Sequence, residues 1–218
     1  MSILSTIGAK ISDFLIDSEI KKPSPKPNAS WAFEVEKTNA WAYWDQAFTP
    51  EECQKIIDYA NGFKKIDAGV SNKSELNNEI RESKVVWITP DPDINWVYQR
   101  MTDVITKLNA DYFNFDLFGF TEGFQFTEYN APSGHYGKHI DSMFNGTVRK
   151  LSFVLQLSDA KDYEGGKLQI HLSDKPEVMK KEQGTLIAFP SPTLHEVTPI
   201  TEGRRYSLVG WITGKPFK

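Results

Sequence analysis

The residues of this chain best suited to chemistry are a histidine and an aspartate two positions apart, His139 and Asp141. In an extended segment, residues i and i+2 point to the same face, so this imidazole and this carboxylate converge while Ile140 faces away. A third ligand has to come from elsewhere in the fold, and His195, which follows a predicted strand at residues 185–189, is the candidate. These three residues together predict a metal site.

The composition of this set indicates which metal it binds. Two histidines and one carboxylate on one side of a metal leave the opposite coordination positions open, an arrangement associated with non-haem Fe(II) oxygenases. The single cysteine, Cys53, cannot form an internal disulfide and leaves no set of thiolates for structural zinc. The pattern therefore favours iron.

An arginine ten residues after His195 adds a second feature. Arg205 and Ser207 lie two positions apart, so in a strand both side chains point inward beside the metal, whereas Arg204 points outward to solvent. A buried guanidinium needs a counter-charge, and its natural partner is a carboxylate held by two parallel hydrogen bonds. A dicarboxylate cosubstrate with one end on iron would supply it, and an ordinary ion pair is the alternative for Arg205.

The remaining histidines and two aromatic residues receive simpler interpretations. His135 lies between a Pro-Ser-Gly stretch and Gly137 and is not followed by glutamate, which argues against a helical metal motif and favours a position at the rim of the site. His171 is interpreted as an ordinary strand histidine. Tyr136 and Trp211 are interpreted as aromatic residues of the core or of a pocket wall.

The elements that must position these residues are helices followed by strands. Residues 49–52 combine an N-cap, a proline and a capping-box acid, which predicts a helix, and a second helix is expected from near Asp93 to about Asn109. Period-2 patterns and turn residues predict strands at residues 84–88, 123–129, 149–157, 167–172, 185–189 and 205–212. This order predicts an α+β domain, an antiparallel sandwich or barrel with the helices packed on one face.

Two further segments differ from this pattern. Residues 1–29 comprise a short amphipathic helix and a proline-rich linker, expected to pack on the chain's own body or to contact a partner subunit in an oligomer, with the folded domain covering residues 30–218. Residues 71–83 are polar and asparagine-rich and predict a mobile loop.

Composition limits the partners. The 218 residues include 39% hydrophobic residues, enough for one core, and carry a net charge of -4, so the chain lacks the basic field that nucleic acid or an anionic membrane would require. No apolar run is long enough to span a bilayer, and the N-terminus does not have the pattern of a signal peptide. These features predict a soluble cytoplasmic protein.

At these residues the sequence resembles the Fe(II)/2-oxoglutarate-dependent dioxygenases, specifically the prolyl 4-hydroxylase-like group with its PKHD-type and hypoxia-type members. The resemblance covers roughly residues 124–211. The matching segments are residues 126–129, 134–141, 155–158, 163–168, 184–190 and 194–200, followed by Arg205. The order of His-x-Asp, histidine and a basic residue ten positions later makes the pattern specific.

The resemblance implies a double-stranded β-helix, or jelly roll. It implies that His139, Asp141 and His195 bind Fe(II), that Arg205 with Ser207 holds the distal carboxylate of 2-oxoglutarate, and that Tyr129 lines the cosubstrate pocket. O2 is the second cosubstrate, and ascorbate is a candidate further cofactor. Collagen-type members carry lysine at the position of Arg205, and the role of Gln156 is left open.

The resemblance further implies hydroxylation of a C–H bond with release of succinate and CO2, with a prolyl residue of a peptide or protein as the expected substrate. Residues 71–83 lie where related enzymes carry a loop that folds over the substrate. Three alternatives stay open: a hydroxylase of free amino acids or other small molecules, a metal enzyme without 2-oxoglutarate, and a non-catalytic jelly-roll protein. Arg205 argues against the last two.

Overall fold

The computed structural model describes residues 38–68, 77, 79–141 and 148–215. The predicted arm and linker, residues 1–29, and the predicted domain boundary at residue 30 lie outside the described residues, so both stay predictions. Among the described residues, no helix is long and apolar enough to cross a membrane.

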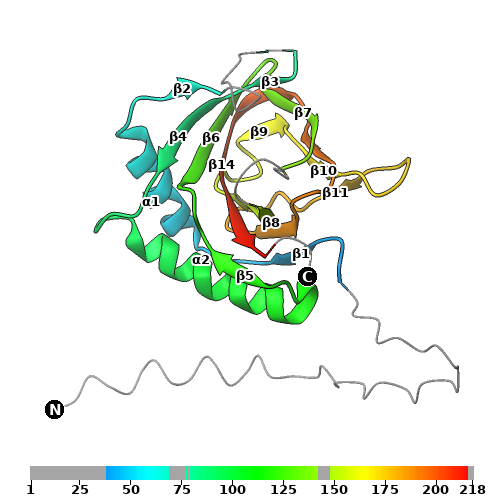
Figure 1. Cartoon of the computed structure of the whole chain (residues 1–218). Coiled ribbons are helices and arrows are strands. Elements are labelled where there is room, and N and C mark those ends of the chain that lie inside the picture. The colour runs from blue at the N-terminus through cyan, green and yellow to red at the C-terminus, as the bar shows by residue number, and fades with distance from the viewer. Residues whose placement is uncertain (1–37, 69–76, 78, 142–147, 216–218) are drawn as a thin grey trace, which may run out of the picture. The chain divides into compact units, whose positions relative to one another are not determined.

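Two antiparallel sheets form the body of the described chain (Figure 1). The larger contains, in order along the sheet, β1 (Ala42–Trp44), β12 (Leu186–Pro190), β8 (Arg149–Gln156), β14 (Ile200–Gly214), β6 (Phe124–Asn130), β4 (Lys84–Ile88) and β2 (Ile66–Asp67), with β5 (Leu117–Gly119) and β9 (Tyr163–Gly165) also paired to β14. The smaller contains β11 (Glu177–Val178), β10 (Leu168–Ile170), β13 (His195–Val197), β7 (His135–His139) and β3 (Arg81–Glu82).

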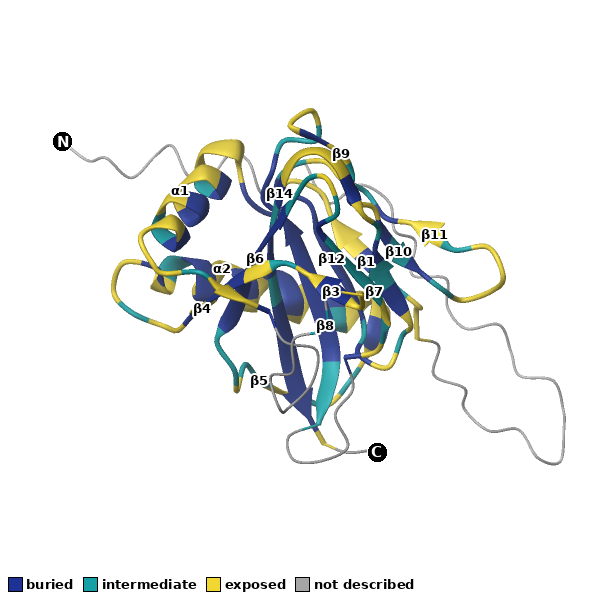
Figure 2. Cartoon of the chain, turned by 90° about the horizontal axis from the view of Figure 1, so that it is seen from above, coloured by how far each residue is buried: buried dark blue, intermediate teal, exposed yellow. Residues whose placement is uncertain are grey.

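The helices lie on the outer side of the larger sheet (Figure 1). Helix α1 (Pro50–Asn61) has the predicted capping box, in which Thr49 and Glu52 each accept a backbone hydrogen bond from the other. Helix α2 (Asn95–Leu108) begins two residues later than predicted and continues into the π-helix η2 (Asn109–Phe113). Figure 2 shows that both helices turn their buried faces inward and their exposed faces to solvent.

Alternation along the strands divides the core into two layers. Phe124 and Phe126 of β6 pack in the cluster between the larger sheet and the helices. Tyr129 of β6 packs with Ile170 of β10 and Val197 of β13 in a second cluster between the two sheets. The prediction of an α+β fold with helices on one face of a sheet is therefore confirmed, and the second layer is where the site is built.

The six predicted strands are present, with β14 beginning five residues earlier than expected. The loop prediction for residues 71–83 is wrong at Arg81 and Glu82, which form β3. The polar composition suggested a loop, but these two residues pair with Tyr136 and His135 of β7, and Arg81 is buried. Residues 71–76 and 78 lie outside the described residues.

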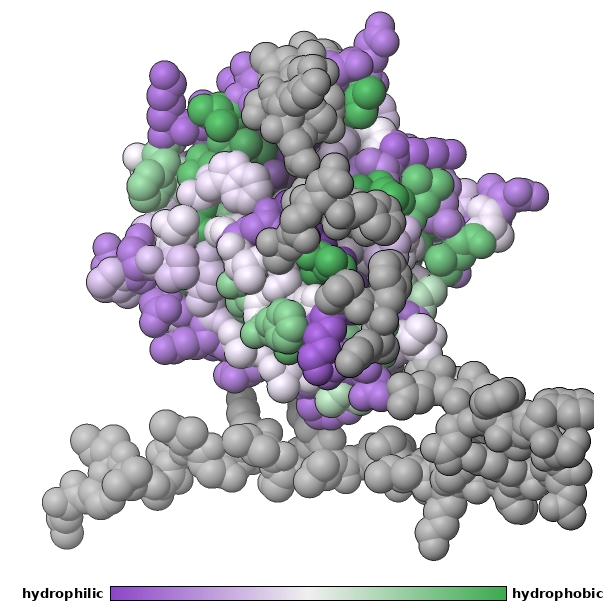
Figure 3. Space-filling view, in the orientation of Figure 1, coloured by the Kyte–Doolittle hydropathy of each residue, from purple (hydrophilic) through white to green (hydrophobic). Residues whose placement is uncertain are grey.

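The face seen in Figure 3 carries hydrophilic residues around its margin, with hydrophobic residues in separate patches among them. Scattered apolar residues of this kind are normal on a protein surface and do not by themselves indicate a docking site.

Candidate metal and carboxylate site

The predicted ligands meet at one point between the two sheets. His139 ends β7, His195 begins β13, and the two are direct partners across this strand pair. One possible ligand atom each from His139, Asp141 and His195 lies within 4.8 Å of the others. Each histidine Nε2 is 3.6 Å from an oxygen of Asp141. Ile140 faces away as predicted and is 47% exposed.

Backbone carbonyls set the orientation of both imidazoles. His139 Nδ1 donates to the Gly137 carbonyl at 2.8 Å, and His195 Nδ1 donates to the Thr193 carbonyl at 2.9 Å. Because a carbonyl can only accept, Nδ1 carries the proton and Nε2 presents its lone pair toward Asp141. Both histidines are thus held in the tautomer that binds a metal through Nε2.

Burial and neighbouring charges shift the pKa values of His139 and Asp141. Burial, with a smaller contribution from His195, lowers the pKa of His139 to about 4, so the imidazole is neutral near pH 7. Burial would raise the pKa of Asp141, but His195 and His139 outweigh it and the pKa is lowered. A neutral His139 imidazole and an ionised Asp141 carboxylate, with the imidazole of His195 beside them, suit a divalent cation, so the residues fit Fe(II).

Aromatic rings hold the histidines in place. The Tyr136 ring stacks on His139 with centroids 3.5 Å apart and planes 16° apart, and the Phe189 ring lies 4.6 Å from that of His195. Asp141 is held by its backbone N–H, which donates to the Ser191 carbonyl at 2.9 Å. The ligands are therefore positioned by packing and by backbone hydrogen bonds together.

A buried cation lies on the inner face of β14. Arg205 is 1% exposed and donates through Nη2 to Gln156 Oε1 at 2.9 Å. Its Nε and Nη1, and the hydroxyl of Ser207, have no hydrogen-bond partner among the described residues. The guanidinium carbon lies 5.4 Å from the ring centroid of Tyr129, which is its register partner on β6.

These unpaired donors decide what the pocket can bind. A buried guanidinium and hydroxyl without partners are costly, and a carboxylate would satisfy both through charge-assisted hydrogen bonds. Arg205 and Ser207 thus share the inner face of β14, and Arg205 lies opposite Tyr129 of β6.

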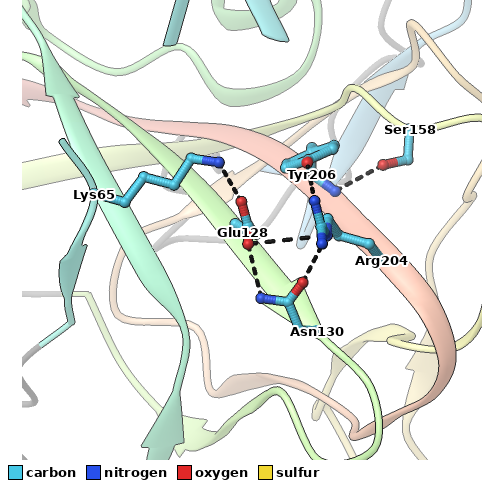
Figure 4. Close-up of polar contacts among 6 residues, drawn as sticks. All are labelled: Lys65, Glu128, Asn130, Ser158, Arg204 and Tyr206. Carbon is cyan, nitrogen blue, oxygen red and sulfur yellow. Dashed lines mark hydrogen bonds and ion pairs between the residues drawn. The ribbon is translucent and has the colours of Figure 1, made fainter. Parts of the chain in front are cut away.

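Arg204 points the other way, as alternation predicts. Its side chain is 55% exposed on the outer face of the larger sheet, where it donates to Asn130 Oδ1 at 2.7 Å and to Tyr206 Oη at 3.1 Å (Figure 4). Glu128, paired with Lys65, completes this outer cluster. Neighbouring arginines therefore serve opposite faces of one strand.

The other histidines lie outside the site. The ring nitrogens of His135 lie 2.8 Å from the Ser133 carbonyl and 3.2 Å from the Glu79 carbonyl, which agrees with a rim position. His171 follows β10 and pairs with Glu196 at 2.8 Å.

The role of Gln156, which the sequence leaves open, is set by its hydrogen bond to Arg205. Alternation along β8 places Ser152, Val154 and Gln156 on one face, but a glutamine on that face does not by itself identify its partner.

Comparison with known proteins agrees with this geometry. Residues 124–213 match the family model of the 2OG-Fe(II) oxygenase superfamily. A PKHD-type hydroxylase of Prochlorococcus marinus (strain NATL2A) is 41% identical over 100 residues, 45% of each chain, and one of Hyphomonas neptunium is 45% identical over 82 residues, 35% of this chain and 37% of the other. The match thus spans less than half the length of these curated relatives. Over this segment the resemblance predicted from the sequence is confirmed.

Solved structures confirm the fold. A Pseudomonas putida prolyl-4-hydroxylase superposes with a TM-score of 0.66 at 22% identity, covering 82% of this chain and 95% of the other. A Trichoplax adhaerens prolyl hydroxylase, solved with a peptide fragment of hypoxia inducible factor, gives 0.68 at 20% identity, covering 81% and 84%. The predicted jelly roll is therefore confirmed.

Proposed function

We propose that this chain is an Fe(II)- and 2-oxoglutarate-dependent dioxygenase that hydroxylates a prolyl residue of a peptide or protein. The observation that carries the proposal is the pairing of the His139, Asp141 and His195 cluster with the buried, partly unpaired guanidinium of Arg205. A metal site alone fits many chemistries, whereas a metal site beside a buried carboxylate receptor fits a cosubstrate that binds at both ends.

Each residue has a role that follows from its position. His139, Asp141 and His195 would hold Fe(II) through two imidazole nitrogens and one carboxylate. Arg205 and Ser207 bind the distal carboxylate of 2-oxoglutarate, and the Tyr129 ring forms a wall of that pocket. Iron and 2-oxoglutarate together supply the oxidation of a substrate C–H bond, with release of succinate and CO2. Burial of the pocket excludes water and strengthens the Arg205 contacts.

The peptidyl substrate is supported by the relatives. The curated relatives are named PKHD-type hydroxylases, and the Trichoplax structure holds a peptide. A net charge of -4 argues against nucleic acid as a partner, and we place the protein in the cytoplasm.

The first test is anaerobic titration with Fe(II) and 2-oxoglutarate, which should give the weak visible charge-transfer band of the chelate. The second is a panel of proline-containing peptides, which should stimulate succinate formation above the uncoupled rate and gain the mass of one oxygen atom on proline. If free amino acids are oxygenated and no peptide is, the peptidyl assignment is wrong and the dioxygenase assignment survives. Absence of the band would contradict both.

A further inference from the structure

We propose that Arg81 binds a carboxylate group of the substrate, at a second anion site beside the metal and separate from the Arg205 pocket. The inference rests on the proposed function, because it concerns the molecule that enters the same site.

Arg81 is a buried cation without an acidic partner. It is 6% exposed, its Nε donates to Ser83 Oγ at 2.9 Å, and its Nη2 is buried without a hydrogen-bond partner among the described residues. No ion pair joins Arg81 to an acid of the described residues. Glu82, the next residue, is exposed and instead accepts from the Ser133 hydroxyl at 2.6 Å. An uncompensated buried guanidinium is costly, and this one lacks a carboxylate just as Arg205 does.

The position of Arg81 places this cation next to the metal ligands. Its guanidinium carbon lies 4.4 Å from the Tyr136 ring centroid, and that ring stacks on the His139 ring at 3.5 Å. Arg81 is therefore one aromatic ring away from an iron ligand.

The residues that follow Arg81 extend the same face. Ser83 bonds to Arg81, and by alternation Val85 and Trp87 continue its side of the chain along β4. Trp87 is 46% exposed, and its ring centroid lies 6.0 Å from that of Trp211. The rings of Trp87 and Trp211 thus form an apolar wall, and Arg81 on the same face supplies a cation without an acidic partner. Together they suit a substrate with an apolar ring and a carboxylate.

Arg149, the other guanidinium near Trp211, differs from Arg81 because it has an acidic partner. It lies 3.7 Å from the Trp211 ring, but its Nε donates to Glu122 at 2.7 Å and its Nη2 donates to the second oxygen of the same carboxylate at 2.5 Å. Its charge is already balanced by a bidentate pair. Arg81 is therefore the better receptor for an incoming carboxylate.

A substrate carboxylate can come from the end of a chain or from an acidic side chain, and matched acid and amide probes distinguish these sources. We would load the chain anaerobically with Fe(II) and 2-oxoglutarate and measure binding by calorimetry. The probes are N-acetyl-L-proline against its amide, an alanyl-proline dipeptide against its amide, and a capped Gly-Pro-Glu-Gly peptide against Gly-Pro-Gln-Gly. We expect the acid of at least one pair to bind about tenfold or more tightly than the amide, as for a buried charge-assisted pair.

Two variants assign the preference to Arg81. Arg81→Met keeps most of the side-chain volume and should abolish the acid preference, whereas Lys138→Met, which removes an exposed cation from the neighbouring strand, should keep it. Equal binding of acid and amide by the wild-type chain in every pair would overturn the proposal, and that comparison needs no variant. An acid preference that survives in folded Arg81→Met would also overturn it. In both cases a normal visible chelate band shows that the proposed function still stands.

Discussion

Arg205 and Gln156 are joined by a hydrogen bond of 2.9 Å from Nη2 to Oε1, deep between the two sheets. The amide of Gln156 is itself oriented, because its Nε2 donates to the Lys180 carbonyl at 3.0 Å. Only its oxygen can then face Arg205. Gln156 thus occupies one of the five N–H donors of the guanidinium and leaves Nε and Nη1 for a ligand.

Gln156→Glu should raise the KM for 2-oxoglutarate at least about tenfold with little change in kcat at saturation. The new carboxylate would pair with Arg205 and compete with the carboxylate of the cosubstrate. Succinate formation measured against 2-oxoglutarate concentration gives both constants. Gln183→Glu is the matched control, since Gln183 bonds to the Leu157 carbonyl away from Arg205. An unchanged KM in Gln156→Glu would remove Gln156 from the cosubstrate pocket.

Arg205→Ala should weaken 2-oxoglutarate binding strongly and leave iron affinity nearly intact. Loss of a charge-assisted pair in a desolvated pocket costs roughly 2 to 5 kcal/mol, or on the order of 30- to 1000-fold and above. Arg204→Ala, on the opposite face of β14, should leave 2-oxoglutarate binding unchanged. Titration of 2-oxoglutarate into the iron-loaded chain measures both variants, and equal losses would contradict the role of strand alternation.

The elements with strong local patterns were predictable, and those that depend on distant partners were not. The capping box formed by Thr49 and Glu52 specifies the start of a helix, and the alternation around Phe126 specifies a strand. In both cases the residues that carry the pattern are only a few positions apart in the sequence. Strand β3 exists because Arg81 and Glu82 meet β7 more than fifty residues later in the chain. A strand of two residues is too short to show the alternation of polar and apolar side chains that would distinguish it from a loop.

The same distinction applies to the site. His139, Asp141, His195 and Arg205 were predictable because the chain has only 4 histidines and the spacing of these residues matches a metal site with a carboxylate receptor. Gln156 was not, since a glutamine in a strand is chemically ambiguous until its partner is known. Its role depends on a contact with a residue 49 positions away.

His139→Ala and His195→Ala should each weaken Fe(II) binding by at least about 100-fold, since loss of even outer-shell partners costs roughly 10- to 100-fold. The wild-type chain should bind one Fe(II), measurable by anaerobic equilibrium dialysis. His135→Ala is the control, because His135 lies on the same strand but bonds only to carbonyls at the rim. Full iron binding by both ligand variants would show that the metal lies elsewhere.

The pH dependence of stability should reveal the buried state of His139. In the metal-free unfolded chain His139 binds a proton below about pH 6.5, whereas the folded chain resists protonation until about pH 4. The unfolded state therefore binds more protons in this window, so the stability of the metal-free protein falls as pH decreases. One such group contributes at most about 1.4 kcal/mol per pH unit.

Urea unfolding of the metal-free chain at about pH 6.5 and pH 5 tests this, because ordinary carboxylates titrate below that interval and contribute little. The wild-type free energy of unfolding should decrease between the two values, and His139→Leu should show a smaller decrease, since it has no proton to bind. If His139→Leu and the wild-type chain lose stability equally, His139 is not the group that resists protonation in the folded state.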